Sequence, residues 1–141
     1  MIYIILAMIF YAIGIMFGAA SARNANTNLA AAITNLISAV VPIVAIIPIM
    51  SKKLFVSSKN GIIFAILSGI SIAFFVMAVN KAYSVNKVAI VSPIVFGGAI
   101  FLSSILSYFI FKEKVSTLQF IGLAFLAVGF GVIIYARVVN R

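Results

Sequence analysis

The chain has 141 residues, of which 66% are hydrophobic and 8% charged, and its formal net charge at pH 7 is +9. An ordinary soluble domain carries about 25% charged residues, and ten cations with one anion cannot cover a surface that faces water on all sides. The composition therefore predicts an integral membrane protein. At about 20 residues per spanning helix, the chain has room for five spans joined by short loops.

The residue types that are missing also restrict the function. The sequence holds no cysteine and no histidine, and Glu113 is its single acidic residue. Hydrolytic, redox and metal chemistry draw mostly on these side chains, so we predict that the protein is not an enzyme and has neither a metal site nor a cofactor. The cations lie in short gaps between apolar runs rather than in a basic stripe, so we expect anionic lipid headgroups, and not nucleic acid, to face them.

Five apolar runs follow one another along the chain. They predict spans near residues 2–20, 29–50, 61–79, 88–110 and 118–138. The runs are apolar around the whole circumference, which favours helices over the alternating strands of a barrel. Because the gaps between them are too short to fold alone, we predict an all-α integral membrane protein in which residues 1–141 form a single five-helix bundle.

Polar residues mark where several of these helices begin. Ser116, with Gln119 three residues later, has the pattern of a capping box before the fifth run. Asn28, Ser58 and Asn86 precede the second, third and fourth runs as candidate N-caps.

The positive charges give no preferred orientation in the membrane. Five spans put the two ends of the sequence on opposite sides, and alternate gaps then receive five Lys and Arg residues each: Lys52, Lys53, Lys59, Lys112 and Lys114 against Arg23, Lys81, Lys87, Arg137 and Arg141. Under the positive-inside rule, zero bias predicts insertion in both directions and pairing as an antiparallel homodimer. The alternative is that Arg137 and Arg141 count for little, which leaves five against three and a fixed cytoplasmic amino terminus.

Several spans carry a stripe of small and polar residues. Polar groups in hydrocarbon are costly and tend to face the bundle interior, and Asn35 is the most costly member of a stripe that also holds Ser38 and Pro42 at helical spacing. Ser68 in the third run and Ser92 in the fourth have similar positions. The alternative is that such residues only let helices pack closely and hydrogen-bond to one another.

None of the five runs contains an acidic residue or a histidine, which excludes a carboxylate proton relay inside the membrane. Glu113 lies between Lys112 and Lys114 in a short gap, where we expect it to form a salt bridge or to interact with the start of the fifth helix.

The stretch from residue 80 to residue 137 resembles an EamA-type repeat of the drug/metabolite transporter superfamily. The resemblance rests on Ala82–Tyr83, on Pro93 early in a span, on the Lys112–Lys114 turn in place of a Gly-Glu-Arg-like one, and on Gly122 and Gly129. The earlier half fits more loosely, through Pro42. Members of the family typically carry two such repeats in ten spans, and one repeat here is consistent with antiparallel pairing. The small multidrug resistance members use four spans and a glutamate in the first, which this chain lacks, so the comparison argues against proton-coupled cation export.

The resemblance implies a bundle in which the first four helices surround a central cavity and the fifth is peripheral. Carried onto this chain, it implies six candidate substrate-binding residues: Tyr11, Asn35, Ser38, Ser68, Ser92 and Phe96. We therefore expect a transporter or exporter in the plasma membrane that moves a small neutral or zwitterionic metabolite, such as an amino acid or a sugar, by alternating access in the inverted homodimer. A flippase of lipid-linked headgroups and a non-transporting membrane subunit or scaffold are the alternatives.

Overall fold

The computed structural model of the chain describes residues 2–49 and 59–139, and its regular elements are helical. They are α1 (Ile2–Asn24), α2 (Thr27–Ile46), the short 3-10 helix η1 (Ile47–Ile49), α3 (Lys59–Val85), α4 (Val88–Phe111) and α5 (Thr117–Val139). Five of these helices are long and apolar enough to cross a membrane. This confirms the predicted all-α membrane class and the number of spans.

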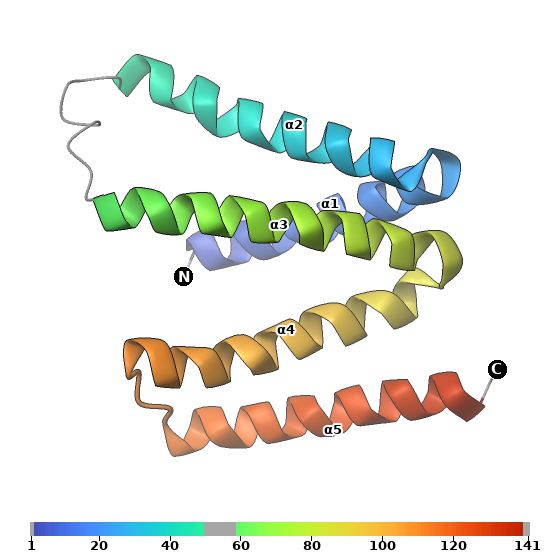
Figure 1. Cartoon of the computed structure of the whole chain (residues 1–141). Coiled ribbons are helices and arrows are strands. Elements are labelled where there is room, and N and C mark those ends of the chain that lie inside the picture. The colour runs from blue at the N-terminus through green and yellow to red at the C-terminus, as the bar shows by residue number, and fades with distance from the viewer. Residues whose placement is uncertain (1, 50–58, 140–141) are drawn as a thin grey trace. The chain divides into compact units, whose positions relative to one another are not determined.

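The helices form two units. In the first, Met1–Val85, each of the three helices α1, α2 and α3 contacts the other two. In the second, Asn86–Arg141, α4 and α5 pack as an antiparallel pair (Figure 1). The single domain over residues 1–141 stays a prediction, as does the homodimer.

Many of the buried side chains are alanines, with Tyr83 as the large exception, whereas many large apolar side chains face outward. Ala19 and Ala22 of α1 and Ala30 and Ala31 of α2 are buried, whereas a side chain such as Phe64 of α3 is 69% exposed. Lipid is as apolar as leucine, so helices in a membrane associate through close packing rather than through burial of large apolar groups. The exposed apolar side chains are therefore the surface that a bilayer would solvate.

Two of the predicted N-caps are wrong by one or two residues. The cap of α2 is Asn26, whose side-chain oxygen accepts hydrogen bonds from the backbone N–H groups of Asn28 (3.0 Å) and Leu29 (3.3 Å). The cap of α4 is Lys87 rather than Asn86, and its side chain makes no capping hydrogen bond. Both turns are tighter than the apolar pattern suggested, because polar residues already belong to the adjoining helices. Ser58 lies outside the described residues.

The capping box at the start of α5 is confirmed. The backbone N–H of Ser116 donates to Oε1 of Gln119 at 2.8 Å, and the N–H of Gln119 donates to Oγ of Ser116 at 3.2 Å. The preceding turn begins at Lys112, which has φ 55° in the left-handed region and ends α4. Glycine usually occupies such a position because it has no Cβ to clash with the backbone.

Helix α3 runs through most of the segment that was predicted to be a gap, residues 80–87. It continues to Val85, because this segment contains neither glycine nor proline and its polar residues are compatible with a helix. Similarly, α1 extends to Asn24. The prolines at 42 and 93 lie inside α2 and α4, which continue past them.

Candidate functional site

One turn of α2 gathers three polar groups. Asn35 is half-buried, and the hydroxyl of Ser38 donates to the backbone carbonyl of Asn35 at 2.9 Å. Pro42 has no N–H, so it cannot give the Ser38 carbonyl the hydrogen bond that a helix normally supplies four residues on. This turn therefore holds an amide, a hydroxyl oxygen and a backbone carbonyl that lacks its helical donor, which is a set suited to an uncharged polar solute.

Serine hydroxyl groups of α3 and α4 also donate to backbone carbonyls of their own helices, as Ser38 does in α2. Ser71 donates to the carbonyl of Leu67 at 2.9 Å, and Ser103 and Ser104 both donate to that of Ile100, at 3.0 and 2.8 Å. A hydroxyl that donates to its own helix keeps lone pairs with which it can accept. These serines thus offer a solute acceptor oxygens rather than donors.

Further polar side chains of the first unit lie where the end of α1 meets the end of α3. Nε of Arg23 donates to the backbone carbonyl of Tyr83 at 3.4 Å. One turn further into the unit, Gly18 of α1 faces Asn80 of α3, and a Cβ added at Gly18 would lie 4.0 Å from Oδ1 of Asn80. Tyr83 is 2% exposed and Asn80 is 3% exposed.

Asn80 differs from the other buried polar groups of the described chain in one respect. Its Nδ2 atom is buried and has no hydrogen-bond partner. Buried polar groups are nearly always hydrogen-bonded, and leaving a donor unsatisfied costs about 1 to 3 kcal/mol. A group that persists in this state in one region of a protein points to a ligand, a water or a partner that supplies the acceptor.

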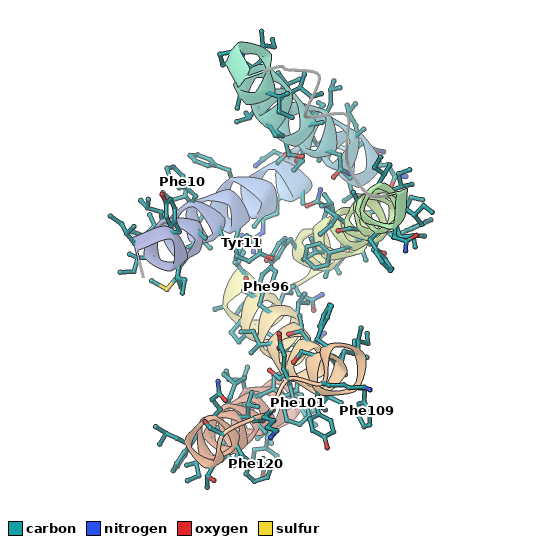
Figure 2. All side chains as sticks on the ribbon, turned by 90° about the vertical axis from the view of Figure 1, so that its left-hand side faces the viewer. Phe10, Tyr11, Phe96, Phe101, Phe109 and Phe120 are labelled. Carbon is teal, nitrogen blue, oxygen red and sulfur yellow. The ribbon has the colours of Figure 1, made fainter. Side chains whose placement is uncertain are left out.

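Tyr11 of α1 is 51% exposed and lies near enough to Tyr83 of α3 for the two phenols to interact electrostatically. Figure 2 shows Tyr11 beside Phe10 on α1, with the two rings directed to different sides of the helix. The phenol of Tyr11 is therefore part of the α1–α3 side of the unit, together with Tyr83.

The second unit holds the two remaining predicted site residues. Ser92 and Phe96 are half-buried in the first turns of α4. Pro93 lies between them and cannot supply the helical hydrogen bond to the carbonyl of Ala89. The start of α4 thus repeats the combination of a serine with a proline that α2 shows at Ser38 and Pro42.

Grooves run along the α4–α5 pair. One, of about 610 Å³, is lined by apolar and aromatic side chains that include Phe101, Phe109 and Phe120 (Figure 2). Another, of about 480 Å³, reaches the turn between the helices and is lined there by Glu113, Lys114 and Gln119. Gly97 packs on Phe130 of α5, because a Cβ at Gly97 would lie 3.5 Å from Cδ2 of that ring. These grooves have the character of lipid-facing surface with a charged end.

The structure brings only some of the six predicted residues together. Asn35 and Ser38 share a turn of α2, Tyr11 and Ser68 lie on α1 and α3 of the same unit, and Ser92 and Phe96 share the start of α4. Their common role in binding a solute stays a prediction.

Sequence reasoning missed Asn80 and Tyr83 as candidate site residues because it placed both in a loop. Their spacing of three residues, directly after the apolar run, was the available signal that they share a face of a longer helix. Residues that could hold a metal give no further signal, because the described part of the chain has no group of three or more His, Cys, Asp or Glu side chains that could bind an ion.

Comparison with known proteins identifies the family. The sequence profile of the EamA-like transporter family matches residues 1–135. No curated protein and no solved structure matches the chain. The match covers nearly the whole sequence and agrees with the five apolar helices, so the chain belongs to the EamA-like transporter family and is a multi-pass integral membrane protein.

Proposed function

We propose that this chain transports a small neutral or zwitterionic metabolite, such as an amino acid or a sugar, by alternating access in a homodimer of oppositely inserted copies. The observation that carries the solute class is the turn of α2 at Asn35, Ser38 and Pro42, which offers hydrogen bonds without charge. Uncharged polar groups in a membrane helix are costly unless they face a cavity or a partner.

The composition of the spans supports the same solute class. The only acidic residue of the sequence, Glu113, lies in the turn between α4 and α5 and not within a span. A binding site made from the spans therefore has hydroxyl, amide, carbonyl and aromatic groups available, but no carboxylate to balance a multivalent cation or to carry a proton. Exchange or uncoupled transport is the kinetic mode that fits these groups.

The inverted homodimer is supported by charge. Counted by alternate ends of the five spans, five Lys and Arg residues fall on each side of the membrane, so the positive-inside rule gives no preferred direction of insertion. Many secondary transporters place their site at the interface of two inverted repeats, and rocking of one repeat against the other exposes the site alternately to each side. Two oppositely inserted copies would supply both repeats.

The insertion experiment uses the absence of cysteine from the natural sequence. Val115→Cys, which precedes α5 in the sequence, and Asn140→Cys, which follows it, are expressed separately and labelled with an impermeant thiol reagent on intact cells and after lysis. We expect about half of each variant to be labelled from outside. Complete labelling of one variant and none of the other would show a fixed orientation and would refute the inverted homodimer.

The transport experiment targets α2. Purified protein in lipid vesicles is screened for uptake of radiolabelled amino acids and sugars, and the active solute is then tested with Asn35→Ala and with the control Asn28→Ala at the exposed start of α2. We expect Asn35→Ala to abolish uptake while insertion and dimerisation persist. Unchanged uptake would remove Asn35 from the site.

The same preparation separates the two alternatives. Uptake of a water-soluble solute into vesicles argues against a flippase of lipid-linked headgroups. A stable assembly of this chain alone, stabilised further by the solute, argues against a non-transporting subunit or scaffold, because only a ligand that binds the folded protein raises its stability.

A further inference from the structure

Asn80, whose buried amide has no hydrogen-bond partner, is not part of the site proposed on α2. Asn80 lies on α3, five residues before the helix ends at Val85, which places it about 7.5 Å along the axis from that end. Across from it lies Gly18 of α1, where an added Cβ would be 4.0 Å from Oδ1 of Asn80, and the Asn80 side chain is buried. The amide is thus held between α1 and α3.

The charges around this end of the first unit are all positive. Arg23 lies at the end of α1 and is anchored to the Tyr83 carbonyl at 3.4 Å, and Lys81 follows Asn80 directly on α3. Residues 1–85 contain no acidic side chain. A donor beside cations, with no acidic side chain in residues 1–85 to pair with them, favours an acceptor that brings its own negative charge.

From this arrangement we infer that Asn80 is the hydrogen-bond donor of a carboxylate-binding subsite between α1 and α3, with Arg23 contributing positive potential at its edge. This inference rests on the proposed function, since it selects carboxylate-bearing zwitterions, the amino acids, from the neutral and zwitterionic solutes considered above. A carboxylate oxygen of the bound solute accepts a hydrogen bond from Nδ2, so the free-energy penalty of a buried donor without an acceptor is relieved on binding. Asn80 is then a substrate-binding residue that works at the end of the helix pair, apart from the groups on α2.

The opposite effects of one substitution on stability and on binding make this testable. Asn80→Leu has similar size but no donor, and replacing an unsatisfied buried polar group with an apolar one of similar shape is neutral or stabilising. We therefore expect Asn80→Leu, purified in phosphatidylcholine nanodiscs, to unfold at the same temperature as the natural protein or higher in the absence of solute. If the amide of Asn80 had a structural role instead, Asn80→Leu would lower the unfolding temperature.

The binding measurement uses a mixture of the standard L-amino acids as probe and the corresponding amino acid amides, which lack the carboxylate, as matched control. The amino acids should raise the unfolding temperature of the natural protein and the amides should not. Asn80→Leu should lose this rise, whereas Asn24→Leu, whose exposed amide donates to the Ala20 carbonyl at 2.8 Å, should keep it. A rise that persists in Asn80→Leu, or that amides produce equally, overturns the subsite, as does no rise in the natural protein.

Two further measurements distinguish the carboxylate subsite from a lipid-binding site and from the proposed transport function. If phosphatidylglycerol in the nanodiscs raises the unfolding temperature through Asn80 and amino acids do not, the acceptor is a lipid phosphate and the inference is overturned. Uptake into vesicles is measured in parallel. A natural protein that binds amino acids through Asn80 but moves no solute contradicts the proposed transport and supports the subsite, whereas undiminished amino acid uptake by Asn80→Leu contradicts the subsite and supports transport.

Discussion

The turn between α1 and α2 provides a direct test of the structure, because two asparagines there have different roles. Asn26 caps α2 by accepting hydrogen bonds from the N–H groups of Asn28 and Leu29 at 3.0 and 3.3 Å. Asn28 lies already inside the helix, with an exposed side chain. The apolar pattern alone assigned the cap to Asn28, so the two residues distinguish the structure from the sequence interpretation.

The perturbation is Asn26→Ala. It removes the acceptor of both hydrogen bonds and leaves two of the first N–H groups of α2 without a side-chain partner. Loss of an N-cap costs about 0.5 to 2 kcal/mol. We expect about 1 kcal/mol, near the middle of this range, because the cap is exposed and water replaces part of the lost hydrogen bonding. This corresponds to about a fivefold change in the ratio of folded to unfolded protein.

The assay is reversible unfolding in mixed dodecylmaltoside and SDS micelles, followed by circular dichroism. Asn26→Asp serves as a conservative variant, because a carboxylate caps equally well and interacts favourably with the helix N-terminus, and Asn28→Ala serves as the matched control. A larger loss of stability for Asn28→Ala than for Asn26→Ala would refute the assignment of the cap. So would equal losses for Asn26→Asp and Asn26→Ala.

Three further outcomes are expected. Ser116→Ala should lower the free energy of unfolding in the same assay by about 1 kcal/mol, because it removes the capping acceptor of α5; a change no larger than that of the neighbouring Val115→Ala would contradict the capping box. Lys112→Gly should raise it by about 0.5 to 1 kcal/mol, since relief of the left-handed conformation exceeds the added flexibility of the unfolded chain, and a net loss would show that Lys112 is not left-handed in the bilayer. Asn35→Ala should abolish uptake in vesicles without a shift in the unfolding midpoint larger than that of Asn28→Ala, and a large shift would assign Asn35 to helix packing instead.

The sequence by itself determined the class of protein and the number of spans. Lipid solvates a helix on all sides, so a run of about 20 apolar residues is sufficient to specify a span without knowledge of its neighbours. The capping box at Ser116 and Gln119 was equally readable, because both of its hydrogen bonds join residues three apart. The left-handed conformation of Lys112 was not readable in this way, because lysine is not a residue that favours a positive φ.

The tertiary structure decided where helices end and which polar groups become buried. Helix α3 continues to Val85 although its last residues are polar, and this places Asn80 against Gly18 of α1 instead of in a loop. A hydropathy pattern reflects only the preference of each residue for lipid or water, so it placed the polar Asn80 in the gap between the third and fourth apolar runs. Its burial depends on a contact with a residue 62 positions away in the sequence, and only the packing of α1 on α3 determines such a contact.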